Sequence, residues 1–546
     1  MHADVLVRVA HVETFTDSPR PGAPGSPHVV AVRDGRIAAV GGDEVAAAYT
    51  GPATEVHDFP GATLLPGLTD AHAHPVWGAI ETGSGVDLSG AGSLEAVLDT
   101  LADALRERPA DAWVTGYDLD LNHFPGAPHG AALEERFPGR AISLMSRDAH
   151  ALVVSPRVIE IAGLTGRETF DDKSSVVTGA DGRPTGYVLE LQAMDLVFAH
   201  YPEVTVDEAA GHVRRQLERL AASGLTGLHA MDFTDPGEAV YRRIEEDGEL
   251  PLRIRCSPLV AADSGPGAWE AAAALQGRHG RRWHVAGVKF MLDGTADNGT
   301  AWFDHPDSHG ENDTSLWRDV DAYRRAVRHF ARRGIATATH AIGDRAVRVA
   351  LDAIEAAGPA AQGPHRIEHL ESVPDDLLGR FAALGVVAGL QPVHGTRHTR
   401  ADGADAWSRR LGPDRAARGW RTRDLLAHGA VVALGSDWPI GPGDPRVALA
   451  DCQLRRPVEA PGTPPVQPEQ ALTAREAYTG MTVAAAVAAG RAADQGRIAP
   501  GHLADLTVLA ANPLTLDPAA QAANAVLATA VGGRLRRHPA PTGGRP

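Results

Sequence analysis

The chain has 546 residues, of which 43% are hydrophobic and 22% charged, a composition typical of a soluble globular protein. Its formal net charge of −17 would repel a polyanion, so we do not expect it to bind nucleic acid. No apolar run approaches the ~20 residues that span a bilayer and no apolar signal segment opens the chain, so we expect a cytoplasmic protein with no membrane contact.

Short β-type runs separated by turn signals fill residues 1–65, and the pair Asp34 and Gly35 is a hairpin cue. The tail, residues 496–546, shows the same pattern in "HLADLTVLA" and "AVLATAVGGRL". Both ends of the chain are therefore predicted to form strands, and we expect them to belong to one domain.

Between these ends, residues 66–495 carry a different pattern. Amphipathic helix patterns at 319–334, 344–358 and 473–490 each close on glycine, as helix C-termini often do. Eight short apolar runs could be buried parallel strands: "TLLPGLTDAHAH", "LTGLHAMD", "LRIRCSPLV", "VAGVKFMLDG", "IATATHAIGD", "HRIEHLE", "VVAGLQPVH" and "VVALGSDWP". This alternation predicts an α/β fold of the (β/α)8 TIM-type barrel class.

One interval, between the first and second runs, is far longer than the ~2–6 residues of an ordinary βα or αβ loop plus one helix. It contains its own strand-like pieces, "AWVTGYDLD", "AISLMSRDAHALVV" and "RPTGYVLE", and a helix pattern at 93–108. An insertion after a barrel strand lies over the face where barrel active sites are found. We therefore predict a lid or specificity subdomain at 85–215.

Polar side chains end six of the eight runs. Because barrel chemistry lies at the C-terminal ends of the strands, these side chains are candidates for one shared site. They are His72 and His74 on the first run, Lys289 on the fourth, His340 on the fifth, His369 on the sixth, His394 on the seventh and Asp437 on the eighth.

The spacing of His72 and His74 is typical of metal ligands, since residues two apart face the same side of a strand. Alone this pair is weak evidence, because surface or core histidines are common. Together with strand-end His340, His369 and Asp437 it indicates a metal, since each buried polar group costs desolvation unless it is paired or metal-bound. We expect one or two divalent ions, with zinc as first candidate and iron or manganese as alternatives.

Lys289 is one of only two lysines, the other being Lys173. An uncharged amine can add CO2 to give a carbamate that bridges two metal ions, whereas a guanidinium stays protonated and offers no acceptor. Burial beside cations would lower the pKa of the amine and favour this reaction. The simpler alternatives are an ion pair with Asp293 or a side chain that reaches solvent.

The order H-x-H, Lys, His, His, Asp on runs one, four, five, six and eight resembles the amidohydrolase superfamily of metal-dependent hydrolases. The match extends over nearly the whole chain and is similar to the subgroup typified by N-substituted formamide deformylase and YtcJ-like proteins. The motifs that carry it are "LLPGLTDAHAHP", "VKFMLDG", "THAIGDRAVRVALDAIE", "HRIEHLE", "LQPVH", "LGSDWPI" and "GRIAPGHLADLTVLAANPL".

This resemblance implies a barrel plus a small β-sandwich built from both chain ends. It implies that His72 and His74 hold one metal, that His340 and His369 hold a second, and that carboxylated Lys289 bridges them. Asp437 would be both ligand and general base for a metal-activated hydroxide that cleaves a C–N bond, most simply an N-formyl or N-acyl amide.

Four further residues are predicted to contact the substrate, namely Asp148, His150, His229 and Trp77, and His394 is predicted to act in catalysis. Each could instead be a structural neighbour of the site. A cyclic-amide hydrolase or a ring deaminase would use the same scaffold, and a barrel that only binds a ligand is a third hypothesis. We expect a small-molecule amide as partner, and a homodimer as one assembly.

Overall fold

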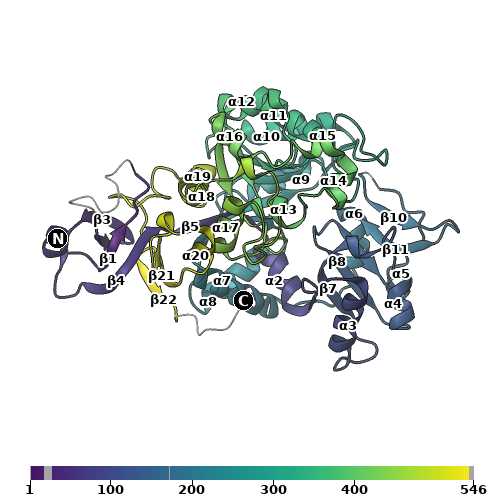
Figure 1. Cartoon of the computed structure of the whole chain (residues 1–546), viewed down its shortest axis with the longest axis horizontal. Helices are drawn as coiled ribbons and strands as arrows, with labels where there is room; N and C mark the ends of the chain where they lie inside the picture. The colour runs from purple at the N-terminus through teal and green to yellow at the C-terminus, as the bar shows by residue number, and fades with distance from the viewer. Residues whose placement is uncertain (1, 17–26, 171, 540–546) are drawn as a thin grey trace.

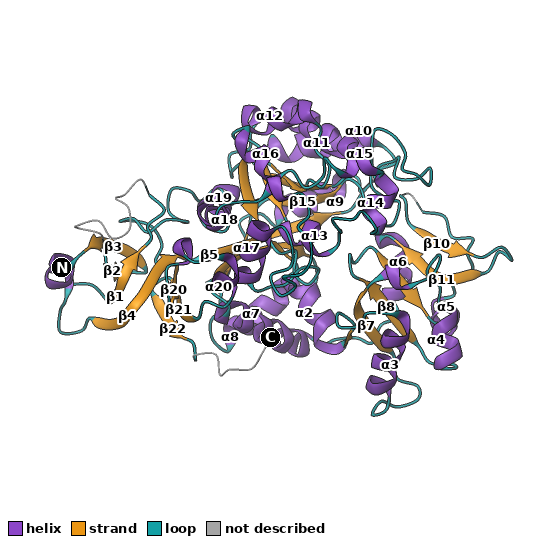
Figure 2. Cartoon of the chain, viewed as in Figure 1, coloured by secondary structure: helices purple, strands orange, loops and turns teal. Residues whose placement is uncertain are grey.

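The computed structural model describes residues 2–16, 27–170 and 172–539, arranged as three bodies along the longest axis of the molecule (Figure 1). A sheet from both chain ends lies at one side, a barrel lies in the middle, and the insertion lies at the other side (Figure 2). No helix among the described residues has the length and apolar character needed to cross a membrane.

The barrel contains eight parallel strands, and each lies, to within one residue, inside one of the eight predicted apolar runs, which confirms the fold class. The order around the barrel follows the sequence, and the short strand β14 (Trp283–Val285) pairs outside it with β13. The eight strands are β5 (Leu68–Ala73), β12 (Leu225–Phe233), β13 (Arg253–Val260), β15 (Val288–Met291), β16 (Thr337–Ala341), β17 (Arg366–His369), β18 (Val387–Leu390) and β19 (Val431–Leu434).

Helices surround the barrel and cover the outward-facing apolar side chains of its strands. These helices are α2 (Pro75–Ser84), α7 (Val206–Ala222), α8 (Gly237–Glu246), α9 (Pro266–Ala274), α10 (Val320–Ala331), α11 (Asp344–Ala357), α12 (Asp375–Leu384), α13 (Pro392–Arg397), α14 (Ala406–Leu411), α15 (Pro413–Ala416), α16 (Thr422–Ala427), α17 (Pro445–Leu454), α18 (Ala474–Gly480), α19 (Val483–Ala488) and α20 (Pro518–Ala522).

The helix expected over 473–490 is two helices, α18 and α19, with a break at Met481 and Thr482. The carbonyl of Met481 accepts a hydrogen bond of 2.7 Å from the backbone N–H of Thr69 on β5. That carbonyl therefore binds the barrel instead of the next helical turn, which explains why a sequence that favours one helix forms two.

Both chain ends build one seven-stranded sheet in the order β22-β21-β20-β4-β1-β2-β3. The predicted hairpin turn joins β2 to β3, with positive φ at Asp34 and Gly35, as a tight two-residue turn requires. The strands are β1 (Val5–Val12), β2 (Val29–Arg33), β3 (Arg36–Gly41), β4 (Glu55–Pro66), β20 (Leu506–Leu509), β21 (Val526–Val531) and β22 (Arg534–Arg537), and the helix α1 (Asp43–Tyr49) packs on one face.

The insertion between α2 and α7 has a six-stranded sheet of its own, in the order β10-β11-β9-β8-β7-β6, and its own apolar clusters. Its elements are β6 (Val86–Asp87), α3 (Leu94–Leu105), β7 (Val114–Leu119), α4 (Ala131–Arg136), β8 (Ile142–Ser146), β9 (Ala151–Val154), α5 (Pro156–Ala162), β10 (Ser175–Thr178), β11 (Pro184–Leu189) and α6 (Leu191–Phe198). The domain boundaries 1–65 with 496–546, 66–495 and 85–215 remain predictions.

Phe290 on β15 tests how the helical layer stabilises the barrel. It is fully buried, and its ring lies 5.6–5.9 Å from the rings of Tyr323, Phe330 and Trp317. Phe290→Ala should lower the free energy of unfolding by about 3–5 kcal/mol because it leaves a cavity that these rings cannot fill. Denaturant unfolding measures this change. Val206→Ala, at a position 37% exposed, should stay within about 0.5 kcal/mol, and equal effects of the two changes would contradict the packing described.

Candidate metal centre

Side chains from four barrel strands and the segments that follow them converge on the carboxylate of Asp437, just after β19. His74 Nε2 and His72 Nε2 lie 3.0 and 3.3 Å from Asp437 Oδ1. His394 Nε2 and His369 Nδ1 lie 3.6 and 4.0 Å from Asp437 Oδ2. The structure thus brings together five of the seven residues that the sequence placed at strand ends.

The backbone fixes Asp437 at the seam where the first and last barrel strands meet. The N–H of Asp437 donates to the carbonyl of His72 at 2.8 Å, and the N–H of His74 donates to the carbonyl of Trp438 at 2.8 Å. Asp437 has a positive φ of 57°, which is uncommon outside glycine and needs support from its surroundings. The two hydrogen bonds that close the barrel supply that support.

His369 reaches the cluster because the chain leaves regular strand geometry there. Glu368 and His369 are neighbours on β17, so alternation would point them to opposite faces of the sheet. The φ angles of 75° at His369 and 54° at Leu370 interrupt that alternation. As a result Glu368 and His369 both contribute to the barrel interior, and each contacts the cluster.

Glu368 orients His72 and was not singled out from the sequence. Glu368 Oε2 lies 2.8 Å from His72 Nδ1, and since a carboxylate only accepts, the imidazole donates through Nδ1. The guanidinium of Arg366 donates to both oxygens of Glu368 at 2.7 and 3.1 Å. The signal was present in "HRIEHLE", where Arg366 and Glu368 share one face of the strand.

Lys289 is 1% exposed, and its amine lies 3.4 Å from His72 Nε2. Among the described residues it forms no ion pair, so neither of its simpler alternatives, an ion pair with Asp293 or a side chain in solvent, describes it. Burial lowers the pKa of Lys289 to about 8, although the charges of Glu368 and Asp437 act in the opposite direction. At pH 7 about a tenth of this amine is therefore uncharged, far more than of an ordinary lysine.

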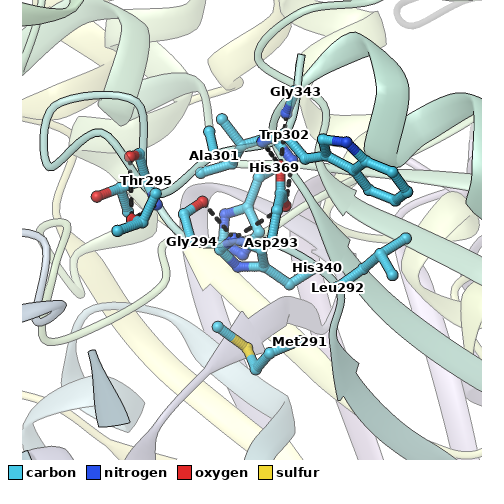
Figure 3. A network of polar contacts seen from close by, with 12 residues as sticks. Met291, Leu292, Asp293, Gly294, Thr295, Ala301, Trp302, His340, Gly343 and His369 are labelled. Atoms are coloured by element: carbon cyan, nitrogen blue, oxygen red, sulfur yellow. Dashed lines mark hydrogen bonds and ion pairs between the residues drawn. The ribbon is translucent and has the colours of Figure 1, made fainter. Parts of the chain in front are cut away.

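His340 lies against the cluster through His369, with ring centroids 4.3 Å apart. His340 Nε2 lies 3.2 Å from the carbonyl oxygen of Gly294 (Figure 3). Asp293 lies beside it and accepts backbone hydrogen bonds from Trp302, Ile342 and Gly343. Asp293 thus ties the loop after β15 to the loop after β16, and this holds His340 at the barrel mouth.

Burial and mutual proximity keep the imidazoles neutral. The pKa values of His72, His340 and His369 are lowered well below the ordinary value, mainly by burial. Burial alone would raise the pKa of Asp437, but His72 and His74 lower it below its ordinary value. At neutral pH, His72, His340 and His369 therefore present neutral rings beside one ionised carboxylate.

These donor atoms fit a divalent cation. One ligand atom from each of His72, His369 and Asp437 lies within 4.8 Å of the others. Because His72 donates through Nδ1, its Nε2 carries a lone pair that faces Asp437 Oδ1, so two acceptors face each other at 3.3 Å. Asp437 Oδ1 is buried and has no well-aligned hydrogen-bond donor, although His74 Nε2 lies 3.0 Å away. A cation among these atoms would remove this conflict, since imidazole and carboxylate are ordinary metal ligands.

The insertion brings His150 and Asp148 to the mouth of the barrel. The ring of His150 lies 5.5 Å from that of His340, and Glu190 raises the pKa of His150 to about 9 against the effect of burial. Asp148 accepts hydrogen bonds from Thr295 and Asn298 in the loop after β15. The insertion therefore forms part of the wall of the site.

Two other predicted contact residues differ in placement. The ring of Trp77 lies edge-on to His74 at 5.9 Å, so it borders the cluster. His229 is buried inside the barrel and its Nδ1 accepts from Arg366 at 2.9 Å, so the structure does not bring it to Asp437. Along the barrel, His229 lies nearer than Glu368 to the amino ends of the strands.

Comparisons with known proteins show one matching family model and several relatives along almost the whole chain. The model of the amidohydrolase family matches residues 55–536. YtcJ of Bacillus subtilis is 29% identical over 503 residues, covering 90% of this chain and 92% of that protein. N-substituted formamide deformylase of Arthrobacter pascens is 26% identical over 521 residues, covering 93% and 94%. A crystal structure of a metal-dependent hydrolase from Pyrococcus horikoshii OT3 matches with a TM-score of 0.71 at 23% identity, covering 94% and 99%.

Gly435, just before the seam, offers a test of the site's positioning. A Cβ there would lie 2.6 Å from the backbone N of His72, so Gly435→Ala must displace the end of β5. We expect the purified variant to retain much less metal than the wild-type protein when both are measured by elemental analysis. Gly379→Ala on α12, where a Cβ meets nothing within 4 Å, is the matched control and should retain full metal content. Equal metal content in the two variants would contradict the role given to the seam.

Proposed function

The chain belongs to the amidohydrolase family and is a metal-dependent hydrolase, and on that premise we propose that it cleaves the C–N bond of an N-formyl or N-acyl amide. The observation that carries the proposal is the ionised carboxylate of Asp437, which lies within 4.0 Å of ring nitrogens of His72, His74, His369 and His394. Support for the amide as substrate comes from the likeness to a formamide deformylase along almost the full chain.

We assign the metal ligands to His72, His74, Lys289, His340, His369 and Asp437, with zinc as first candidate. A bound divalent ion would polarise the substrate carbonyl and lower the pKa of water toward ~7. Lys289, as a carbamate, would supply the bridging oxygens of a two-ion site, and its partly uncharged amine supports that modification. His72 would bind through Nε2, because Glu368 engages its Nδ1.

Asp437 would act as the general base and then the general acid. Its lowered pKa keeps it ionised at neutral pH, so it can accept a proton from the attacking water. After the carbonyl carbon is attacked, Asp437 returns that proton to the departing nitrogen, which leaves as a neutral amine. His394 Nε2 is buried without a hydrogen-bond partner, 3.6 Å from Asp437 Oδ2, and we assign it to contact the substrate during this step.

The pocket wall beyond this centre would come from the insertion. His150, charged because of Glu190, and Asp148, held by Thr295 and Asn298, lie on the side of His340. Trp77 lies on the side of His74. We assign these residues to substrate selection; Asp148 and His150 belong to the insertion, whereas Trp77 lies on α2.

Two substitutions test the catalytic assignment. Asp437→Asn removes the proton acceptor and His72→Ala removes a ligand, so each should lower kcat/KM by a factor of at least about 100–10,000. A screen of N-formyl, N-acyl and cyclic amides by amine release supplies the substrate for this measurement. Asp43→Asn, whose side chain is 98% exposed, is the control and should keep wild-type activity. Full activity in either site variant would refute the assignment.

Lys289 is tested by two replacements that differ in charge. Lys289→Arg should be as damaging as Lys289→Ala, because a guanidinium cannot form a carbamate. Short carboxylic acids added to Lys289→Ala should restore part of the rate by placing a carboxylate where the carbamate lies. Activity of Lys289→Arg near the wild-type level would show instead that only a positive charge is needed at this position.

A further inference from the structure

A cavity opens at the amino ends of the barrel strands, at the opposite end from the candidate metal centre. Its volume is about 40 Å3, more than the ~10–15 Å3 that one water molecule needs. Side chains of the first three strands line it together with α19 and the segment that leads to β20. The polar lining residues used below are Thr69, Thr226, His229, Arg255, His284 and Asp505.

Arg255 on β13 is a buried cation without a matching carboxylate. It is 5% exposed, its Nη1 donates to Ser257 Oγ at 2.9 Å, and its Nε is buried with no hydrogen-bond partner. Within the described part of the chain it forms no ion pair. An isolated buried charge is costly unless a counter-charge lies beside it.

Its neighbours across the sheet are histidines, and neither of them supplies a negative charge. His229 on β12 and His284 on β14 lie in register with Arg255, so three basic side chains stand side by side on neighbouring strands. Arg366 donates to His229 Nδ1 at 2.9 Å, so the proton of the neutral imidazole is on Nε2. Burial and the nearby arginines lower the pKa values of His229 and His284, which keeps both rings neutral.

The two carboxylates nearest to the cavity are already engaged. Asp505 accepts two hydrogen bonds from Arg253, at 2.9 and 3.1 Å, and one from the backbone N–H of Gly532. Glu368 accepts from Arg366 and from His72. Neither is free to neutralise Arg255.

We propose that this cavity binds a small inorganic anion of chloride size, held by the guanidinium of Arg255 and the Nε2–H of His229. The hydroxyl of Thr69 on the lining can add a further donor, whereas that of Thr226 already donates to the carbonyl of Leu68 at 3.3 Å. The site lies at the opposite end of the strands from Asp437. It is therefore separate from the proposed hydrolytic function, and it compensates a buried charge that no residue of the barrel compensates.

Bromide locates the anion directly. Crystals of the full-length protein grown in sodium bromide and measured above the bromine absorption edge should show an anomalous peak within hydrogen-bonding reach of Arg255 and His229. A cavity without such a peak overturns the proposal.

Thermal unfolding tests binding in solution, with sodium chloride compared against sodium gluconate at equal ionic strength. Above the dissociation constant, a tenfold rise in chloride should increase the ratio of folded to unfolded wild-type protein about tenfold, while bulky gluconate should not. Arg255→Met should abolish this difference. Arg455→Met, which alters another buried arginine that does not line the cavity, should preserve it.

Each result of the unfolding experiment either supports or overturns the proposal. A wild-type protein that unfolds alike in both salts overturns the proposal, and a bromide peak in that case would mark an adventitious ion only. A chloride response that survives in Arg255→Met also overturns it. If Arg255→Met does not fold, Arg255→Lys, which keeps the charge but loses the fork of donors, should show a weakened response, and an unchanged response counts against the site.

Discussion

Closure of the barrel between β5 and β19 is the constraint on which the site depends. Two backbone hydrogen bonds at this seam, from Asp437 to His72 and from His74 to Trp438, set the positions of three candidate ligands. The first and last strands are distant in sequence, so no local preference could bring these side chains together. The left-handed backbone of Asp437 is stable only because this closure holds it.

A column of polar side chains, each in contact with the next, extends through the interior of the barrel. Asp437 lies beside His72, His72 donates to Glu368, Glu368 pairs with Arg366, and Arg366 donates to His229. From His72 to His229, each buried group in this column has a hydrogen-bonding partner of suitable role. The column explains why His72 presents Nε2 toward Asp437, and it ends at Arg255, the cation without a carboxylate.

The insertion shapes the site through a few polar contacts at its edge. Its sheet has its own apolar clusters, while Asp148 and His150 contact the loop after β15 and the ring of His340. A barrel whose ligands are fixed by closure can thus keep one chemistry while an insertion with a separate core changes the pocket wall. The apolar clusters of the insertion are separate from that of the barrel, so residues of the two parts can vary independently.

The sequence by itself determined the barrel, because apolar runs and helix periods are local patterns, and it determined the strand-end positions of His72, His74, Lys289, His340, His369 and Asp437. Tertiary structure alone decided which of them meet. Strand alternation could not place His369, whose positive φ breaks it, nor separate His229, which binds Arg366, from the cluster. The roles of Glu368 and Arg255 also became evident only from the tertiary structure. Whether a buried charge is compensated depends on side chains from strands that are distant in sequence.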